Sequence, residues 1–583
     1  MTTATPARDG LRETISRTAA GRPVPSAWRR ASRRASDEDP VISWVVSIGI
    51  TVFSFLLRLW HLGTPKVFEF DETYYAKDAW SLLHYGFAKN PVADADKLIL
   101  AGTTDPSKVF GTGPEMVVHP DVGKWLIAAG EKVFGMDTFG WRISAAVVGS
   151  LMILVLIRLV RRMTGSTLLG AVAGLLLSFD GLEFVLSRLG LLDIFGAFFI
   201  LLAVTLMVVD RDWYRDRMAR LVPDQVTGPR AFGPVRRLLL RPWLLAAGIA
   251  WGLALGTKWD AVYPLAAFSI LYVAWCAGAR RMFGVSWARS KALLADGVPA
   301  FVHLVVVAGI VYTATWTGWL VNHHQYETSL SSTQYTQYTG HGHCGGDGNH
   351  TFIADNPNPN AKWPTAKEPE QHGLAGLEQA LQSLWYYHRD VYTFHTHFLN
   401  CATHTYASKP SGWPLLNRPV GVAADTGIQP GAVDGGQRCT APAGSDCLRQ
   451  VLLLGTPVLW WGGALALIAA GILWIGARDW RYGLAVVGAL STWLPWLQYA
   501  ARPIFSYYAI SMLPFTVIAI TLIMGRLIGT ARVSTPQRTV GVVISGAFFM
   551  LVLVNFAWFW PIYTNALLTH SQWLDRIWFS RWI

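Results

Sequence analysis

Long apolar runs, separated by shorter polar ones, dominate the chain. Each run is close to the roughly 20 residues that a helix needs to cross the hydrocarbon core of a membrane. We place eleven, at about 41–60, 141–160, 167–186, 190–209, 242–257, 259–277, 297–317, 449–475, 482–499, 504–525 and 539–560. The pattern predicts an all-α polytopic membrane protein with about eleven transmembrane helices and two large extracytoplasmic loops.

Composition supports a membrane protein and argues against other classes. Of the 583 residues, 52% are hydrophobic and only 15% are charged, against roughly 25% charged in soluble domains. A disordered or nucleic-acid-binding chain is therefore not expected, despite a net charge of +12. The 28 Trp residues fit the membrane–water interface, where an amphipathic ring is favoured.

Arg and Lys predict the orientation, because they concentrate in cytoplasmic loops. The tail 1–40 is rich in Arg, and every second loop after it is basic, so we place the N-terminus in the cytoplasm and the C-terminus outside. The chain then divides into four parts. They are a cytoplasmic basic tail (1–40), core helices 1–7 with an external loop at 61–140 (41–317), a large external loop (318–448), and helices 8–11 with an external C-terminus (449–583).

Four of the five cysteines lie in the 318–448 loop, on an oxidising face. Four cysteines allow three connectivities, but Cys439 with Cys447 is the favoured pair because it closes a short loop. The remaining two are Cys344 and Cys401. The spacing of His and Cys in this loop matches no standard zinc pattern, so we expect no metal.

Two adjacent carboxylates, Asp71 and Glu72, follow the first apolar run among aromatic residues. Mutual repulsion and apolar surroundings disfavour their charged forms, which suits a general base. The alternative is an acidic first turn of an interfacial helix at about 73–83, which the helix dipole would favour.

Cations recur at the predicted external ends of the spans. Together they suit an anionic ligand such as a lipid-linked phosphate. They are Lys124, Arg142, Arg188, Lys258 and Arg502. For Arg188 the alternative is an ion pair with Asp193 across a short turn. The long loop adds His388, Arg389, His397 and Lys409, and its alternative role is a compact subdomain that packs aromatic side chains.

Several of these motifs, in this order, resemble the protein O-mannosyltransferases, and the bacterial, actinobacterial-type members most closely. The resemblance extends from about residue 58 to the C-terminus. The motifs are Phe70-Asp71-Glu72, His119-Pro120-x-x-Gly123-Lys124-Trp125, Gly140-Trp141-Arg142, Ser187-Arg188-x-Gly190-x-Leu192-Asp193, Lys258-Trp259-Asp260, Trp316-Thr317-Gly318-Trp319, Tyr387-His388-Arg389, Phe394-His395-Thr396, Ser408-Lys409-Pro410 and Gly412-Trp413-Pro414.

The resemblance implies the GT-C glycosyltransferase fold and a specific reaction. Mannose would pass from a polyprenyl phosphate carrier to Ser or Thr hydroxyls of exported proteins, with inversion at the anomeric carbon. Asp71 matches the catalytic carboxylate, with Glu72 beside it. The eukaryotic members carry a β-trefoil MIR module in the long loop, whereas 318–448 shows no threefold repeat.

A leaving phosphate would need fixed cations in a water-poor site. We nominate Arg502, Lys258 and Arg142, with Lys124 or His397 as helpers. Supporting roles fall to His119, Arg188, Asp193, His388, Arg389 and Lys409. Polyprenyl phosphomannose, exported polypeptides near the secretion translocon and membrane lipids are the expected partners, with no cofactor and no nucleic acid. The expected location is the cell membrane, with the active site outside.

Two alternatives remain. One is a GT-C transferase with another lipid-linked sugar or with a lipid or glycan acceptor, such as an aminoarabinose or arabinosyl transferase. The other is a transporter, whose halves often repeat and whose polar sites lie near the midplane. The chain shows no internal repeat, and its polar motifs gather at one predicted face.

Overall fold

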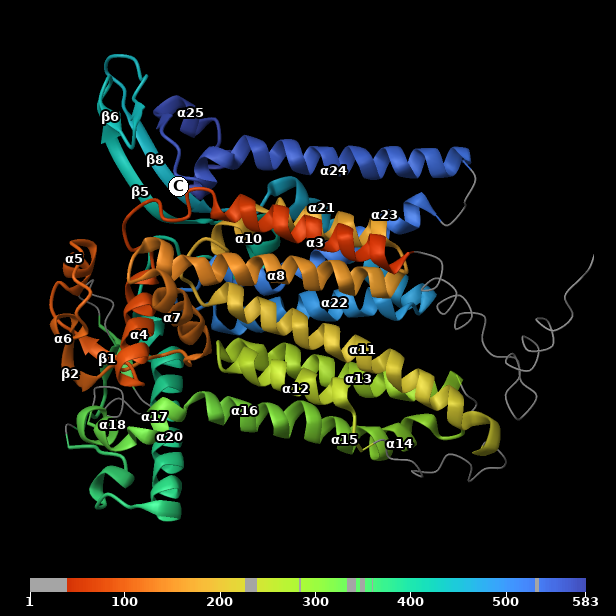
Figure 1. The fold of residues 1–583 in the computed structure, drawn as a ribbon, viewed down its shortest axis with the longest axis horizontal. Coiled ribbons are helices and arrows are strands. Elements are labelled where there is room, and N and C mark those ends of the chain that lie inside the picture. The colour runs from red at the N-terminus through yellow and green to blue at the C-terminus, as the bar shows by residue number, and fades with distance from the viewer. Residues whose placement is uncertain are drawn as a thin grey trace, which may run out of the picture.

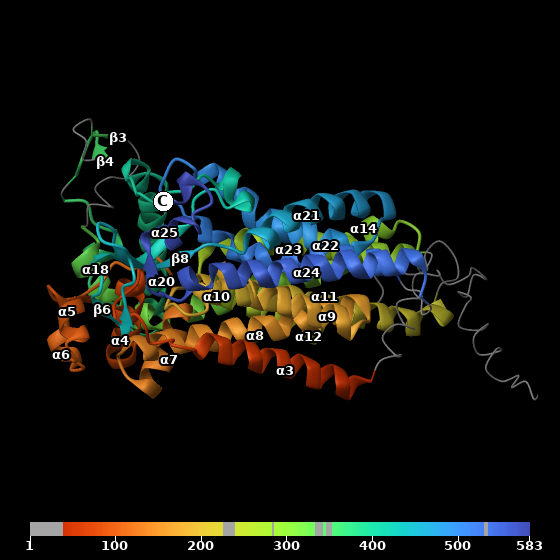
Figure 2. The ribbon, with the colours of Figure 1, turned by 90° about the horizontal axis from the view of Figure 1, so that it is seen from above.

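The computed structural model describes residues 39–225, 239–282, 285–332, 342–345, 352–358, 360–529 and 534–583. The basic tail, except for its last two residues, and residues 226–238 of the basic stretch 211–241 lie outside the described residues. Helices dominate the described part of the chain, and most of them run side by side along its long axis (Figures 1 and 2).

Eleven helical segments occupy the eleven predicted apolar runs. Seven are long and apolar enough to cross a membrane: α3 (Pro40–Leu59), α8 (Thr138–Thr164), the first 26 residues of α11 (Asp193–Gln225), η1 with α13 (Trp259–Met282), α14 to α16 (Ala288–Thr315), α21 (Pro457–Ala477) and α24 (Pro536–Tyr563). Three are apolar but shorter: α9 (Thr167–Ser178), α12 (Pro242–Leu255) and α23 (Leu513–Ile528). The last is α22 (Trp480–Trp493).

Three predicted runs differ from the helices they contain. The run at 449–475 begins with strand β8 (Cys447–Leu453), and α21 starts only at Pro457. The run at 504–525 begins with the 3₁₀ turn η8 (Ser506–Ser511) before α23. The run at 167–186 breaks at Asp180, whose buried carboxylate accepts hydrogen bonds from Glu183 N, Thr456 N and Trp460 Nε1. That carboxylate ends α9 and caps the short α10 (Gly181–Leu186).

The connecting segments gather at one end of the helix bundle, which we call the loop end (Figure 1). From residues 60–137 come β1 (Lys89–Pro91), β2 (Phe110–Pro114) and helices α4 (Glu72–Tyr85), α5 (Ala95–Leu100), α6 (Pro106–Val109) and α7 (Val122–Phe134). From residues 317–456 come α17 (Thr317–Val321), α18 (His323–Leu330), α20 (Gly373–Thr396), η4 (Thr365–Lys367), η5 (Phe398–Cys401), η6 (Pro410–Leu415) and strands β3 to β8. The C-terminal α25 (His570–Leu574) and η9 (Ser580–Trp582) lie there too.

Short antiparallel strands, which the all-α expectation missed, stiffen the loop end. β5 (Val420–Ile428) pairs with β8, and β8 pairs with β9 (Leu568–Thr569), so the long loop and the C-terminal segment share one sheet. Smaller pairs join β1 to β2, β3 (Gly342–Cys344) to β4 (Phe352–Ala354), and β6 (Val433–Asp434) to β7 (Gln437–Arg438).

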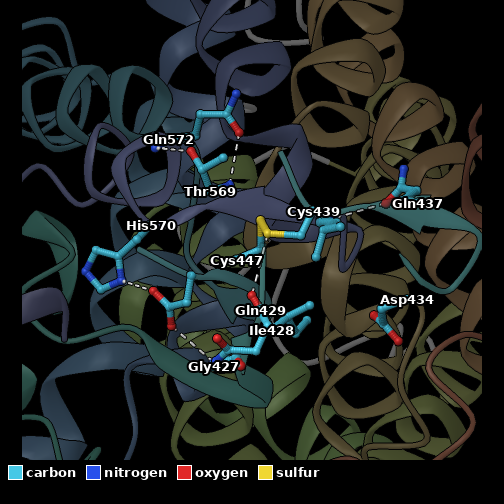
Figure 3. Close-up of a disulfide and its surroundings, with 12 residues drawn as sticks. Gly427, Ile428, Gln429, Asp434, Gln437, Cys439, Cys447, Thr569, His570 and Gln572 are labelled. Carbon is cyan, nitrogen blue, oxygen red and sulfur yellow. Dashed lines mark hydrogen bonds and ion pairs between the residues drawn. A yellow bond between two sulfur atoms is a disulfide. The ribbon is translucent and has the colours of Figure 1, made fainter. Parts of the chain in front are cut away.

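Both disulfides lie in the long loop. The predicted bond between Cys439 and Cys447 forms, and Cys344 bonds with Cys401. Figure 3 shows the first of these beside Thr569 and His570 of the C-terminal segment. His570 Nδ1 lies 3.3 Å from a carboxylate oxygen of Asp446. Cys447 is also paired with Thr569 across the sheet. The disulfide therefore closes its loop beside the strand that holds the C-terminal segment.

Close helix contacts in the bundle depend on glycine. A Cβ atom at Gly248 of α12 would lie 1.8 Å from the carbonyl oxygen of His303, in the segment that leads into α16. Small residues at such contacts let two backbones approach, which matters in a membrane because lipid is as apolar as the side chains.

Gly248→Ala should therefore destabilise the fold, by about 1–3 kcal/mol, as overpacking usually does. The measurement is the midpoint of thermal unfolding in detergent or nanodiscs. Gly309→Ala is the matched control, since a Cβ at Gly309 would have no neighbour within 4 Å. Equal midpoints for the two variants would contradict the close contact between α12 and α16.

Candidate active site

Asp71 lies immediately before the first residue of α4. The sequence offered two interpretations of this position, an acidic helix start and a general base, and the two are compatible in the structure. The backbone carbonyl of Asp71 accepts from Tyr74 N and Tyr75 N, but its side chain does not cap the helix. The carboxylate instead faces the Tyr75 hydroxyl, which donates to it over 3.5 Å. Asp71 thus starts the helix with its backbone, and its carboxylate remains available for chemistry.

The residue before Asp71 has an uncommon backbone conformation. Phe70 has a φ of 52°, which costs free energy in a residue with a Cβ and is typical of functional sites. Its ring packs edge-on against Phe505 and Tyr507, with centroids 5.3 and 5.9 Å away, and also contacts His404. These aromatic contacts hold the turn that presents Asp71.

The environment of Asp71 favours the protonated acid more than water does. Burial raises the pKa of its carboxyl to about 6. Lys258 opposes this rise and Asp193 adds to it. A pKa near the working pH is what a general base needs.

Lys258 and Asp193 come from different elements and form a buried ion pair. Lys258 lies in the turn after α12, and its Nζ is 2.7 Å from an Asp193 carboxylate oxygen at the start of α11. The ammonium also lies 3.9 Å from the centre of the Tyr508 ring. A cation is therefore fixed close to Asp71.

Arg188 does not form an ion pair with Asp193, which was the alternative predicted for it. Its Nη2 donates to the carbonyl of His61 over 3.1 Å, and its guanidinium lies 4.9 Å from the centre of the Phe184 ring. Lys258 takes the place of Arg188 beside Asp193 because the turn after α12 brings it closer.

A second cation, Arg502, reaches the same region through histidines. Its Nη1 donates to His395 Nδ1 over 2.6 Å, and the His395 ring stacks on His119 at 5.8 Å between centroids. Burial lowers the pKa of His395 to about 3, and Arg502 adds to that effect. Burial, then Lys258 and His395, lowers the pKa of His119 well below its usual value. Both rings are thus neutral at pH 7, and His395 can accept from Arg502.

The predicted phosphate ligand Arg142 is fully used inside the protein. Its Nε and Nη2 each donate to Glu72 over 2.8 Å. Its remaining donors reach the carbonyls of Leu62, Pro65 and Val67. Five donors are all that a guanidinium has, so Arg142 has no donor left for a phosphate in this structure.

Glu72 is saturated in the same way. Its two oxygens accept from Arg142 and also from the backbone amides of Glu69 and Gly190, at 2.8–2.9 Å. The side chain is fully buried, and a carboxylate has about four acceptor sites. Glu72 therefore holds structure together and is not free to act beside Asp71 as a second base.

The other predicted helpers have contacts of their own. Lys124 is 1% exposed and sits between Asp78, at 2.9 Å, and Asp121, at 3.4 Å. His397 ends α20 and contacts the Thr396 hydroxyl. Two carboxylates neutralise Lys124, and the geometry gives His397 no contact with Arg502.

The supporting residues of the long loop divide by exposure. His388 stacks on Trp259 at 5.2 Å and bonds with the Tyr312 hydroxyl, so it joins α20 to the span ends. Arg389 pairs with its neighbour Asp390 and is half exposed. Lys409 is exposed, although its loop packs on the site through Trp413 and Tyr508, whose ring centroids are 6.2 Å apart.

Sequence reasoning chose His397 where the structure brings His395 to Arg502. The signal was present, because His388 and His395 are seven residues apart and so share one face of a helix, whereas His397 does not. Tyr75, Phe505 and Tyr508 were also missed. They carry no charge, and only folding brings them to Asp71.

No group of three or more His, Cys, Asp or Glu side chains in the described ranges could hold a metal ion. The groups that the described residues bring to this site are a half-buried carboxylate, two cations and neutral imidazoles.

The sequence matches two family models. Residues 48–318 match the model described as dolichyl-phosphate-mannose-protein mannosyltransferase, and residues 380–582 match the C-terminal four-transmembrane region of protein O-mannosyltransferase. The chain belongs to the protein O-mannosyltransferase family. Two relatives are named polyprenol-phosphate-mannose–protein mannosyltransferase. That of Mycobacterium tuberculosis is 32% identical, over 93% of this chain and 92% of its own. That of Mycolicibacterium smegmatis is 33% identical, over 93% and 94%.

The fold of this family member agrees with that assignment. The S. cerevisiae protein O-mannosyltransferase Pmt1–Pmt2 complex, bound to the sugar donor, aligns with a TM-score of 0.61 at 13% identity, over 95% of this chain and 94% of the yeast chain. At that identity the likeness concerns the fold alone. It confirms the GT-C fold that the sequence resemblance implied.

Arg142→Gln should strongly destabilise the protein, because it leaves the fully buried Glu72 without its cation. Breaking a buried ion pair on one side typically costs about 3–5 kcal/mol. The midpoint of thermal unfolding is the measurement, and Arg389→Gln is the control, since its half-exposed pair contributes little. Unchanged stability in Arg142→Gln together with weakened donor binding would restore Arg142 as a phosphate ligand.

Proposed function

We propose that this protein transfers mannose from a polyprenyl phosphate carrier to Ser or Thr hydroxyls of exported proteins, with inversion at the anomeric carbon. The observation that carries the proposal is Asp71, a half-buried carboxylate with a pKa of about 6, beside the cations Lys258 and Arg502. The names of the mycobacterial relatives support the same donor and acceptor class.

The reaction needs a base, because a Ser or Thr hydroxyl is a poor nucleophile. Asp71 takes the hydroxyl proton as the oxygen attacks the anomeric carbon. The new bond joins that carbon to the acceptor oxygen, and the bond from the same carbon to the phosphate oxygen breaks. Polyprenyl phosphate leaves with both electrons of the broken bond, and a single in-line displacement inverts the carbon.

The leaving phosphate gains negative charge, which fixed cations stabilise in a water-poor site. Arg502 suits this role, because in the described part of the chain its guanidinium has a neutral histidine as partner and no carboxylate within ion-pair distance. Lys258 is closer to Asp71 but is already neutralised by Asp193. We assign the phosphate to Arg502 first and to Lys258 second.

The loop end faces outside the cell in this proposal. The opposite ends of the spans carry the paired arginines of the basic loops, such as Arg161 with Arg162 and Arg280 with Arg281, which favour the cytoplasm. The N-terminus would then be cytoplasmic, with the active site and C-terminus outside. Acceptors would arrive from outside, near the translocon, and recognise surfaces other than an MIR module.

Asp71→Asn should abolish mannose transfer and leave the fold intact, because the amide cannot take the proton while the backbone of residue 71 still starts α4. The measurement is transfer of labelled mannose from polyprenyl phosphate to a Ser/Thr peptide, with a lipid acceptor in parallel. Transfer retained in Asp71→Asn would contradict the assignment of Asp71. Transfer to lipid alone would contradict the protein acceptor.

The pH profile supplies the control for this variant. The deprotonated carboxylate is the active form, so the wild-type rate should rise with pH through about 6 and then level off. Asp71→Glu should keep part of the rate with a displaced midpoint. A flat profile between pH 5 and pH 8 in the wild type would argue against a titrating base in the rate-limiting step.

Arg502→Gln should raise the KM for the lipid donor more than the KM for the peptide, since it removes a charge from the phosphate and not from the acceptor. The measurement is steady-state kinetics with each substrate varied in turn. Arg438→Gln, an exposed arginine on β7, is the matched control. If Arg502→Gln leaves the donor KM and kcat unchanged, the phosphate must be assigned to another cation.

A further inference from the structure

Helix α20 runs across the direction of the spans at the loop end (Figure 1). One of its faces is a continuous stripe, because residues three, four and seven apart share a helix face. The stripe consists of Leu374, Leu377, Leu381, Trp385, His388, Tyr392 and His395. A helix can form without large apolar and aromatic side chains along one face. Such a face indicates that the helix packs against another surface.

Two residues in the C-terminal part of the stripe, His388 and His395, already contact the ends of the spans, while Tyr392 between them is 56% exposed. His388 stacks on Trp259 and bonds with Tyr312, and His395 bonds with Arg502. The stripe therefore faces the bundle. The N-terminal part of the stripe lies on the same helix face, beyond these contacts. It therefore points in the same direction, toward the side on which the spans lie.

That N-terminal part is exposed in the protein alone. Leu374 is 87% exposed and Trp385 is 71% exposed, and Leu377 and Leu381 are exposed as well. In Figure 1, α20 continues beyond α16 (Val307–Thr315), the outermost span on that side. Four large apolar side chains in water along one face are unusual for a soluble surface and typical of a binding face.

The exposed apolar surface of the neighbouring span leads directly to this stripe. Val302, Val306 and Ile310 are exposed on the segment that runs into α16 and ends at Thr315. Tyr312, near that end, is the residue that bonds with His388. In a membrane those side chains contact lipid. The stripe on α20 thus adjoins this lipid-facing surface at the loop end of the span and runs across the direction of the span.

We propose that the N-terminal half of α20, residues 373–386, lies in the interface of the adjacent bilayer leaflet, with Leu374, Leu377, Leu381 and Trp385 immersed among the lipid chains and headgroups. An amphipathic helix parallel to the membrane plane buries its apolar face in this way. Trp385 and Tyr386 suit the headgroup level. The proposal concerns the membrane contact alone and does not depend on the reaction.

The experiment measures depth with a nitroxide attached at Leu377→Cys, in the full chain reconstituted into phosphatidylcholine–phosphatidylglycerol nanodiscs. Cys276→Ala removes the buried free thiol, and the four disulfide cysteines are kept. Val433→Cys, exposed on the β6–β7 hairpin, carries the control label. Power-saturation EPR then compares collisions with oxygen, which concentrates in lipid, and with a water-soluble nickel chelate.

The label at 377 should collide more with oxygen than with the chelate, and the label at 433 should show the reverse. A second stripe position, Leu381→Cys, should match 377 if the first label is tolerated poorly. Chelate collisions at 377 equal to those at 433 would overturn the proposal. So would protection from both reagents with spin–spin broadening, because that result would place a second copy of the chain on the stripe.

Discussion

The buried ion pair between Glu72 and Arg142 is the contact on which the loop end depends. It joins the start of α4 to the start of α8, and the same two side chains bind the backbone at Leu62, Glu69 and Gly190. Two charges without water are costly unless every donor and acceptor is used, and here each one is. Glu72 directly follows Asp71 in the chain. The contacts of Glu72 therefore hold the turn that carries Asp71 in place.

This arrangement explains why the two adjacent carboxylates have different surroundings. Glu72 points into the protein and is paired with the Arg142 guanidinium, while Asp71 is only partly buried and has no arginine partner among the described residues. Asp71 sits between Lys258, which favours its charged form, and Asp193, which disfavours it. Lys258 and Asp193 thus act in opposite directions on the pKa of the Asp71 carboxyl, and the Glu72–Arg142 pair fixes the residue that follows Asp71.

Periodicity and charge predicted the parts of this protein that local sequence determines. Each of the eleven apolar runs contains a helix. Asp71 was predicted from its pairing with Glu72 and from the family motif, and Lys258 and Arg502 from the set of cations at the span ends. The partner of each charge was beyond local reasoning. In the sequence, Arg142 and Lys258 are both cations near span ends. In the structure, Arg142 forms an ion pair with Glu72, and Lys258 forms one with Asp193.

The strand β8 shows the same limit for secondary structure. A short, largely apolar segment beside a span, such as Cys447–Leu453, fits either a helix start or a buried strand. Only its pairing with β5 and β9 decides. That pairing brings the C-terminal segment to the long loop, where Trp582 Nε1 donates to the Leu416 carbonyl and the Ser506 hydroxyl donates to the Arg418 carbonyl. Residues 506–508 then contact Phe70 and Lys258. The environment of Asp71 is therefore assembled from segments that lie more than 400 residues apart in the chain.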